Sequence, residues 1–387
     1  MLLRPLALMV AAVAIVACSA PPLPSSEPLG GATDAGAGAG GGSLFDAGGP
    51  TGPPPADAGG LCGNDIHKVL TDPPNVYFVI DASGSMSQFA GAGQSRYERV
   101  HGATVEMVKN LGPLINVGAA IFPLGATEDD ACHVGGEVFP MSPGDLDGDG
   151  PTTNGFAAAT DVIPFGNTPT ASSLAAIKSK VTALPGRTIV VLATDGAPNC
   201  NLQLTCSGSD CIPNIEGCDP SFQCCALGGN CCTPGGPAGP EACVDKTGAV
   251  DAIADLEAAG VAVHVIGIPG TQAYKTVLNQ MALAGGAAQL SPPFFYEVED
   301  LDNLGAVLGS IAAVVISCEF EIPEPPEDPN FTNVYLDKQL LKQDPKDGWI
   351  WKSETVVELR GAACSKLKSG QVKQVQIVSG CPTEATK

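Results

Sequence analysis

Short apolar runs alternate with amphipathic stretches from residue 75 onward. The runs are typical of buried strands, and the stretches between them repeat apolar residues at helical spacing. Strands are expected at residues 75–80, 116–122, 187–194, 261–268 and 294–298, and helices at 97–111, 170–184, 247–259, 274–284 and 301–316. Thr247 is the expected N-cap of the third of these helices. The alternation predicts an α/β domain with a mostly parallel central sheet covered by helices on both faces.

The pattern changes after Cys318. An acidic, proline-rich connector at residues 321–329 excludes helix, and only short strand-like runs follow it. These runs fall at residues 333–336, 349–352, 356–359 and 372–379. We expect residues 318–387 to form a small β-rich region stapled by cysteines, with a Cys364–Cys381 bond and a bond from Cys318 to the main domain.

The first sixty residues have the composition of a signal and a tether. One positive charge precedes an apolar segment, which closes on Ile15-Val16-Ala17-Cys18-Ser19 and resembles a bacterial lipobox. That resemblance implies a lipoprotein signal peptide at residues 1–17 and lipidation of Cys18. About twelve apolar residues are short for an uncleaved anchor that spans a bilayer. Residues 18–60 are rich in Gly, Pro and Ala and predict a disordered tether.

From this lipoprotein signal we expect the protein in the cell envelope, held to the membrane only through its N-terminal lipid. Ser19 after the cysteine favours the outer membrane, if the sorting rule of enterobacteria applies. The formal net charge of −22 and the pI of about 4.3 argue against a nucleic-acid partner, because such binding needs a basic surface. They favour cations instead.

A candidate metal site follows the first strand of the α/β domain. Asp81, Ser83 and Ser85 offer three oxygen donors from one loop at the carboxyl end of an apolar run. Oxygen donors suit a hard cation such as Mg²⁺ or Mn²⁺. The alternative is a polar turn before a helix, where the same residue types are common.

Two further loops should meet this one, because ligands of such sheets lie beyond the carboxyl ends of the strands. One loop contains Thr168 and Thr170 before a helix, and the other contains Asp195 after the most apolar strand. The ordered set Asp-x-Ser-x-Ser, Thr-x-Thr and Thr-Asp-Gly resembles the metal-ion-dependent adhesion site (MIDAS) of von Willebrand factor type A (VWA) domains. The resemblance covers about residues 75 to 316.

That resemblance implies a Rossmann-like domain whose Mg²⁺ takes an acidic group from a partner. Alignment with the family's Thr-x-Thr favours Thr170 over Thr168 as the hydroxyl donor. In the family the two serines ligate directly, and the two acids often act through water. The metal-binding residues implied for this chain are Asp81, Ser83, Ser85, Thr170 and Asp195.

A cysteine-rich insert at residues 197–244 interrupts the α/β domain, which we place at residues 61–317. The insert contains nine of the fifteen cysteines but no Cys-x-x-Cys pair and no histidine, so zinc is disfavoured and a disulfide knot is favoured. Nine is an odd number, so at least one bond should leave the insert, or one thiol is free. Cys62, Cys132, Cys318, Cys364 and Cys381 are the candidate outside partners.

A second acidic loop carries Asp145, Asp147 and Asp149, followed by Gly150 at the sixth position. It begins like a calcium loop, but Phe156 stands at the twelfth position, where an EF-hand has a glutamate. A weak Ca²⁺ site and a solvated acidic turn both remain open.

The motifs favour binding over catalysis. The four histidines form no His-Glu-x-x-His, and the chain has no phosphate-binding loop and no Gly-x-Ser-x-Gly elbow. We therefore expect a non-enzymatic, cation-dependent adhesion module of the cell envelope, which binds an acidic group on a protein or an envelope polymer. The alternatives are a structural envelope protein with a stabilising metal and, with less support, a hydrolytic enzyme.

Overall fold

The computed structural model describes residues 61–385, apart from residues 64, 68, 70–72, 92 and 218–228. The expected signal peptide (1–17), the lipidation site Cys18 and the tether (18–60) lie outside these residues. No helix among the described residues has both the length and the apolar composition needed to cross a bilayer.

A six-stranded sheet forms the centre of the α/β part, in the order β4-β3-β2-β5-β6-β7. All neighbouring strands run parallel except β4, which pairs antiparallel with β3 at the edge. The strands are β2 (Asn75–Asp81), β3 (Asn116–Phe122), β4 (Gly136–Pro143), β5 (Thr188–Thr194), β6 (Ala262–Gly267) and β7 (Tyr296–Glu297). The predicted α/β class with a mostly parallel sheet is confirmed.

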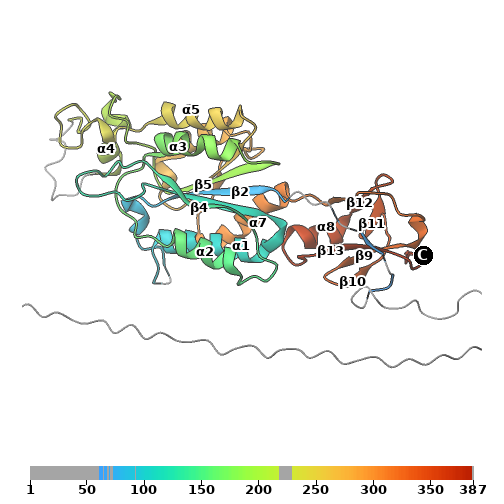
Figure 1. The fold of residues 1–387 in the computed structure, drawn as a ribbon. Helices are drawn as coiled ribbons and strands as arrows, with labels where there is room; N and C mark the ends of the chain where they lie inside the picture. The colour runs from blue at the N-terminus through green and yellow to red at the C-terminus, as the bar shows by residue number, and fades with distance from the viewer. Residues whose placement is uncertain are drawn as a thin grey trace, which may run out of the picture. The chain divides into compact units, whose positions relative to one another are not determined.

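Helices cover both faces of this sheet (Figure 1). One face packs against α1 (Arg96–Leu111), α2 (Pro151–Thr160) and α7 (Leu304–Val315). The other packs against α3 (Thr170–Thr182), α5 (Lys246–Glu257) and α6 (Lys275–Ala284). The alternation of β2 shows why this strand is central: Phe78 and Ile80 enter the first core, and Tyr77 and Val79 enter the second. A strand buried on both faces requires the unbroken apolar run seen in its sequence.

The ten strands and helices expected for the α/β part are present, with boundaries shifted by a few residues. Three elements were not expected: β4, α2 and the short helix α4 (Ile212–Glu216) within the cysteine-rich insert. The predicted N-cap at Thr247 is wrong, because α5 begins earlier and the Asp245 side chain accepts a hydrogen bond from the Gly248 amide at 3.1 Å. A carboxylate at this position also matches the positive end of the helix dipole.

The C-terminal region forms two small antiparallel sheets and one helix. The sheet orders are β1-β13-β9-β10 and β11-β12-β8. The strands are β1 (Asp65–His67), β8 (Glu319–Glu321), β9 (Thr332–Leu336), β10 (Gln339–Leu341), β11 (Trp349–Trp351), β12 (Val356–Leu359) and β13 (Val375–Ser379), and the helix is α8 (Gly361–Lys368). β1 pairs with β13, so residues 65–67, which the sequence analysis placed in the α/β domain, belong to a C-terminal sheet.

The disulfides of this region differ from the expected ones. Cys62 bonds to Cys381, and Cys318 bonds to Cys364, so the predicted Cys364–Cys381 pair and the predicted bond from Cys318 to the main domain are wrong. The reason lies in two elements that the sequence analysis missed. Strand β1 brings Cys62 to the end of β13, and helix α8 turns Cys364 back toward the start of β8.

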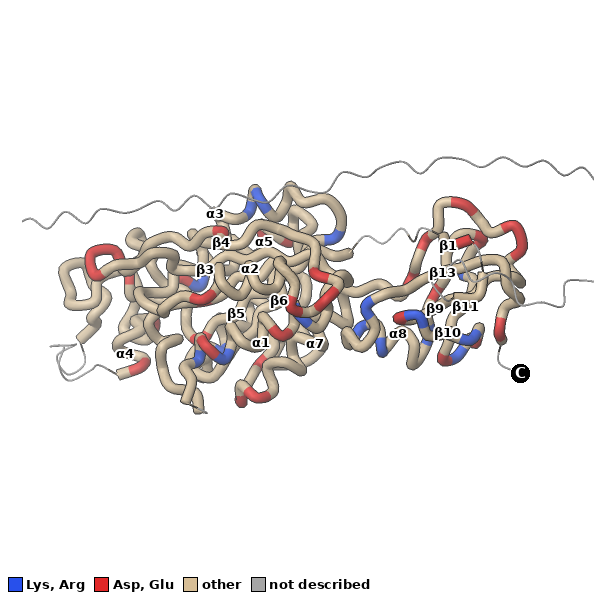
Figure 2. The backbone as a smooth tube through the Cα atoms, turned by 60° about the horizontal axis from the view of Figure 1, so that its bottom comes forward, with Lys and Arg blue, Asp and Glu red and all other residues tan. Residues whose placement is uncertain are grey.

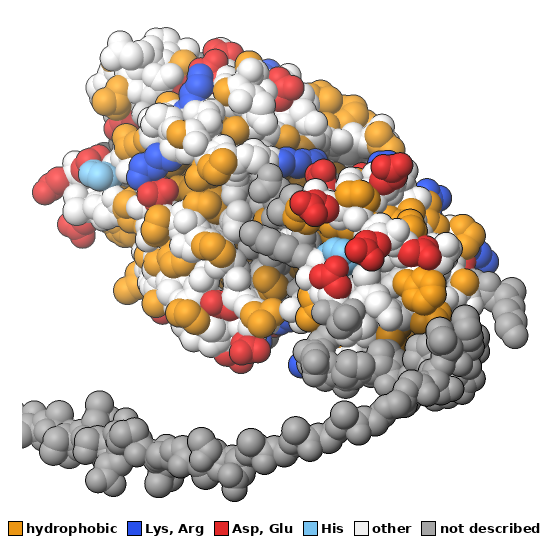
Figure 3. Space-filling view, turned by 45° about the vertical axis from the view of Figure 1, so that its right-hand side comes forward, with side chains coloured by type: hydrophobic (Ala, Val, Ile, Leu, Met, Phe, Trp, Pro, Cys, Tyr) orange, Lys and Arg blue, Asp and Glu red, His pale blue; other side chains and the backbone are white. Residues whose placement is uncertain are grey.

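Charged residues are scattered over these elements. Figure 2 shows acidic positions in the loops and helices of both the α/β part and the C-terminal region. The face drawn in Figure 3 mixes hydrophobic, acidic and basic side chains. The excess of acid in the full sequence, 41 Asp and Glu against 19 Lys and Arg, therefore does not by itself mark a site.

Candidate metal centre

Asp81 is the last residue of β2, and both of its carboxylate oxygens are engaged. Oδ1 accepts a hydrogen bond from the Ser83 amide at 2.8 Å, and Oδ2 accepts one from the Thr194 hydroxyl at 2.6 Å. The first bond folds the chain back directly after the strand and leads into a short 3-10 turn, η1 (Gly84–Ser87). The second bond ties β2 to the neighbouring strand β5 at their shared carboxyl edge.

The two serine hydroxyls continue this network to the second acid. The Oγ atoms of Ser83 and Ser85 lie 3.1 Å apart, and Ser85 donates to Oδ1 of Asp195 at 2.7 Å. Since the single Ser85 proton points to the carboxylate, Ser83 donates to Ser85. Asp81, Ser83, Ser85 and Asp195 are thus linked by hydrogen bonds into one group, which comes from two of the three loops that the sequence analysis expected to meet at this edge.

The loop that precedes α3, here called the Thr170 loop (residues 166–170), lies against the same edge. The Gly84 amide donates to the Gly166 carbonyl at 2.8 Å, which joins this loop to the two serines. Thr170 is the first residue of α3, is 1% exposed, and has its hydroxyl 3.5 Å from the Thr168 carbonyl oxygen. Thr170 is therefore carried by a loop bonded to the serine turn, but it has no direct hydrogen bond to the four residues above.

Asn199 connects the Thr170 loop to the loop that carries Asp195. The Thr168 amide donates to Oδ1 of Asn199 at 2.7 Å, and the Asn199 amide donates to the Thr168 carbonyl at 2.9 Å. Both residues are buried. Two opposed hydrogen bonds fix the distance and the direction between the two loops, so Asn199 acts as a clamp on the segment that holds Thr170.

Both acids of the site are buried, whereas Ser85 is partly exposed. Asp81 is fully buried and the Asp195 side chain is 0% exposed. Burial, together with the nearby charge of Asp195, raises the pKa of Asp81 to about 7. Burial also raises the pKa of Asp195, but hydrogen bonds from Ser85 and the Arg96 guanidinium oppose that rise. The Arg96 guanidinium, 2.6 Å from Oδ2 of Asp195, thus offsets part of the effect of burial on this acid.

This group of residues fits a hard divalent cation. Every donor is an oxygen, and the set combines carboxylates with hydroxyls, which is the chemistry that Mg²⁺ and Mn²⁺ prefer. The hydrogen bonds hold the donors within two adjoining loops, and the Thr170 loop lies beside them. The identity of a cation and its ligands stays a prediction for all five residues.

The cysteine-rich insert begins directly beyond this centre and includes a short helix, α4 (Ile212–Glu216). Cys132 bonds to Cys200, which confirms that at least one disulfide leaves the insert. Within the insert, Cys206 bonds to Cys243 and Cys211 to Cys232. Cys218, Cys224 and Cys225 lie outside the described residues.

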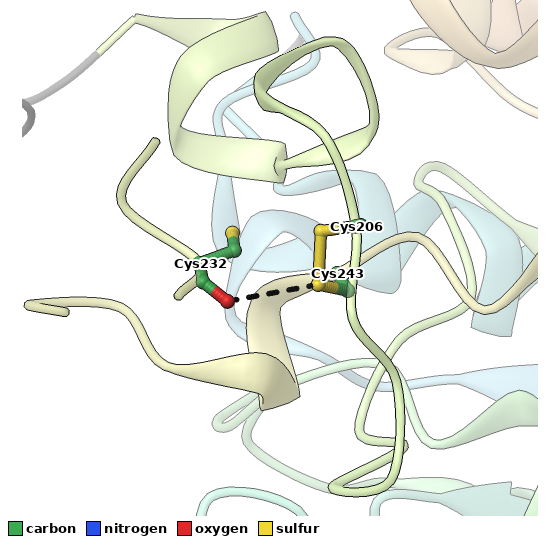
Figure 4. A group of neighbouring side chains, drawn as sticks. All are labelled: Cys206, Cys232 and Cys243. Carbon is green, nitrogen blue, oxygen red and sulfur yellow. Dashed lines mark hydrogen bonds between the residues drawn. A yellow bond between two sulfur atoms is a disulfide. The ribbon is translucent and has the colours of Figure 1, made fainter. Parts of the chain in front are cut away.

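The sulfur atoms of Cys206, Cys232 and Cys243 lie within 4.8 Å of one another, a spacing that a metal could use (Figure 4). All three sulfurs are already in disulfides, so none is a thiolate. The contact of 3.9 Å between Cys243 Sγ and the Cys232 carbonyl oxygen is not a hydrogen bond, because a disulfide sulfur carries no proton. The trio is the meeting point of two disulfides, as the sequence predicted for a disulfide knot.

The second acidic loop has its oxygens largely engaged. Asp145 accepts hydrogen bonds from the amides of Thr152 and Thr153, so it caps the first turn of α2. Asp149 pairs with Lys109 at 2.7 Å. Two of the three acids, Asp145 and Asp149, therefore already have partners within the protein. The weak Ca²⁺ site stays a prediction.

The roles of Thr194, Asn199 and Arg96 were not anticipated. Thr194 belongs to the Thr-Asp-Gly motif but was given no role, and Asn199 follows Asp195 by four residues, so both polar side chains could have been noted as supports. Arg96 is the first residue of α1, and its Nη1 atom lies 2.6 Å from Oδ2 of Asp195. Nothing in the local sequence of Arg96 predicts this contact, since the two residues are 99 positions apart.

Comparison with known proteins adds structural neighbours only. No protein-family model and no curated protein sequence matches the chain. Solved structures similar to it include the pilus adhesin SpaC from Lactobacillus rhamnosus GG in its open conformation (16% identity, TM-score 0.47, 80% of this chain and 39% of that one). The chain thus spans about two fifths of the length of SpaC.

Two further neighbours are VWA domains by their own descriptions. The vWF domain of the type V pili tip protein Mfa5 from Porphyromonas gingivalis has 16% identity and a TM-score of 0.43 over 64% of this chain and 96% of that one. The von Willebrand factor type A structure from Catenulispora acidiphila has 13% identity and a TM-score of 0.40 over 83% and 62%. The fold class itself rests on the sheet order and the helix layers described above.

Proposed function

We propose that this protein is a cation-dependent binding module of the cell envelope, and that it holds a partner through an acidic group. The observation that carries the proposal is the chain of hydrogen bonds from Asp81 through Ser83 and Ser85 to Asp195 at the carboxyl edge of the sheet. Buried oxygen donors of this kind are costly without a cation or a proton to balance their charge. Asp81, Ser83, Ser85, Thr170 and Asp195 would hold Mg²⁺ or Mn²⁺.

The same donors argue for a ligand rather than a reaction. A bound cation would supply an electrophilic centre that accepts a carboxylate oxygen. Among the described residues, no hydrogen bond from a histidine reaches Asp81, Ser85 or Asp195. The residues around the site therefore bind and orient, and we propose no catalytic step.

The cysteine-rich insert is proposed to select the partner. It begins within two residues of Asp195, and Asn199 and the Cys132–Cys200 bond fasten it beside the Thr170 loop. Leu202 follows this anchor and is 65% exposed, and Phe165 and Ile163 of the neighbouring loop are 45% and 91% exposed. Exposed apolar side chains beside a buried polar centre are typical of a protein-binding surface.

Location at the cell surface is part of this proposal. Its support is the lipobox-like segment ending at Cys18 and the disulfides, which form in oxidising compartments. The protein would be anchored at the outer membrane through its lipid. Its partner would be a protein or an envelope polymer.

The test is capture of envelope components with and without EDTA. The full chain is immobilised and exposed to an envelope extract in Mg²⁺, and the same is done with Asp81→Ala and Ser87→Ala. Ser87 lies in the same 3-10 turn but is exposed and donates only to the Gly84 carbonyl, so it is the matched control. If the protein binds its partner through the cation, the wild type and Ser87→Ala should capture the partner in Mg²⁺. Capture should be lost in EDTA and with Asp81→Ala. Capture that survives both treatments, with a fall in thermal stability only, would instead support a structural metal.

The insert is tested separately. The Cys200 amide bonds to the Glu241 carbonyl at 2.8 Å, so the ends of the insert are adjacent and residues 202–239 can be replaced by a short Gly/Ser linker. Cys243→Ser is added, because its partner Cys206 is removed. We expect unchanged Mg²⁺ binding and altered partner selection. An unchanged set of captured partners would contradict a role in selection.

A further inference from the structure

A guanidinium is built into the edge of the candidate metal centre. Arg96 Nη1 lies 2.6 Å from Oδ2 of Asp195 and 3.5 Å from the Ser85 carbonyl oxygen. The Arg96 side chain is 16% exposed and that of Asp195 is 0% exposed, so water screens this ion pair little. Among the salt bridges of the described residues, the Arg96–Asp195 pair is the one that includes a residue of the centre.

The surroundings of Arg96 hold it in place. Ser95 caps α1 with a capping box, which fixes the first turn of the helix, and the Arg96 amide donates to the Gln88 carbonyl at 2.9 Å. Gly270 has a φ of +127°, and a Cβ atom there would lie 2.9 Å from Arg96 Nη1 and 2.8 Å from the Asp195 carbonyl oxygen. A glycine at this position leaves the room that the guanidinium occupies.

The charge of Arg96 changes the electrostatic balance of the site. With a divalent cation bound, both acids are ionised, so Asp81 and Asp195 contribute two negative charges and Arg96 contributes one positive charge. A divalent cation then leaves the site with one excess positive charge, whereas without Arg96 the cation and the two acids would cancel. An excess positive charge in a buried site attracts a further carboxylate strongly, because the local dielectric is low.

We propose that Arg96 is a positioning and charge-setting residue, which weakens the protein's own hold on the cation and so makes the cation depend on a carboxylate from the partner. The inference rests on the proposed function, since it assigns to Arg96 a role in cation-dependent binding. Arg96 also stabilises the protein when no cation is bound, because its guanidinium pairs with the Asp195 carboxylate, which would otherwise be a buried charge without a partner.

The experiment measures Mg²⁺ affinity by isothermal titration calorimetry in the presence and absence of acetate, which stands for the partner's acidic group. Arg96→Gln removes the charge but keeps a hydrogen-bond donor, and Arg96→Lys keeps the charge. Arg99→Gln is the matched control, because Arg99 lies on the same helix and pairs with Asp302, outside the centre.

Arg96→Gln should bind Mg²⁺ about tenfold more tightly than the wild type without acetate, and acetate should improve its affinity less than it improves that of the wild type. Arg96→Lys and Arg99→Gln should stay within about threefold of the wild type, a smaller change than one full charge would cause. In EDTA, Arg96→Gln should melt at a lower temperature than the wild type, and Mg²⁺ should restore more of its stability. A merely structural arginine would lower stability without raising cation affinity.

Equal Mg²⁺ affinities for the wild type and Arg96→Gln overturn the role of Arg96, as does an identical rise for Arg96→Lys and Arg96→Gln. If Arg96→Gln does not fold, Arg96→Met removes the charge with a side chain of similar length, and the same rise in affinity is expected or the inference fails. Absence of Mg²⁺ binding by the wild type is a different result, because it contradicts the proposed function itself and the inference with it.

Discussion

The Ser85 hydroxyl donates a hydrogen bond to Oδ1 of Asp195 at 2.7 Å, although the two residues lie 110 positions apart. The bond exists because β2 and β5 are parallel neighbours, so the loops that follow them leave the sheet at the same edge. It joins the loop that carries Asp81 to the loop that carries Asp195. Each support of that centre has a measurable consequence.

The Asn199 clamp should be needed for cation binding. Asn199→Ala removes the acceptor of the buried Thr168 amide, which should destabilise the fold by about 1–3 kcal/mol and loosen the loop that carries Thr170. We expect Mg²⁺ affinity to fall by about tenfold or more, measured by calorimetry. Asn201→Ala is the control, since the Asn201 side chain accepts only from the Gln203 amide within the insert. Equal affinities for both variants would show that the clamp does not shape the site.

The disulfide between Cys132 and Cys200 should contribute to both stability and binding. It closes a segment of 68 residues, so its removal by Cys132→Ala with Cys200→Ala should cost about 4 kcal/mol of unfolding free energy, measured by denaturant titration. Mg²⁺ affinity should fall as well, because the bond anchors the insert next to Asn199.

The matched control is the pair Cys318→Ala with Cys364→Ala in the C-terminal region. Its bond closes a segment of 46 residues and should cost a similar amount of stability. Cation affinity should be unchanged in this variant. If both double variants bind Mg²⁺ as the wild type does, the anchor has no part in the site.

His264 should make the fold sensitive to acid. It is 4% exposed on β6, its Nδ1 atom has no hydrogen-bond partner, and burial and the charge of Arg187 lower its pKa from 6.5 to about 4. Between pH 6.5 and 4 the unfolded chain binds the proton and the folded chain does not, so this group's stability contribution is lost as the pH falls. The loss should reach about 3 kcal/mol below pH 4.

His264→Phe should therefore flatten the fall in unfolding free energy between pH 6.5 and 4, measured by chemical denaturation at several pH values. The raised pKa of Asp81 has the opposite effect, because a folded pKa above the unfolded one favours the fold at low pH and loses that effect as the pH rises toward 7. Asp81 is present in both proteins, so the difference between them isolates His264. The exposed His133, changed to Gln, should leave the profile unaltered. Parallel profiles for the wild type and His264→Phe would contradict the assignment.

Most of the α/β fold could be predicted because its signals are local. The run Thr188-Ile189-Val190-Val191-Leu192 is buried on both faces, and only a central parallel strand needs such a sequence. The position of each metal-site motif at the end of such a strand then follows from the direction of the chain. Asp81 and Asp195 were placed at one edge for this reason.

The missed elements lack a local signal. Strand β4 contains Pro140 and Pro143 and is half exposed, which an edge strand tolerates but a sequence pattern hides. Helix α2 begins at a proline and consists mostly of small residues, with Phe156 as its buried anchor. Strand β1 has three residues and pairs with β13 more than 300 residues away, so nothing in its own sequence reveals the pairing.

The same reasoning explains the limits at the site. Asp81, Ser83 and Ser85 follow one another in a single motif, so their proximity is encoded locally. The contact of Arg96 with Asp195 depends on how α1 is set against the sheet and on the absence of a side chain at Gly270. A pattern of residue types along the chain does not contain that information.

The most direct measurement is the affinity of the purified protein for Mg²⁺ and Mn²⁺ alone, by calorimetry, for the wild type, Asp81→Asn and Ser87→Ala. One saturable site is expected for the wild type and for Ser87→Ala, and Asp81→Asn should lose about tenfold to a hundredfold in affinity, since it removes the charge that Ser83 and Thr194 orient. A wild type that binds neither cation, or an Asp81→Asn variant that binds as tightly as Ser87→Ala, would contradict a metal centre at this edge.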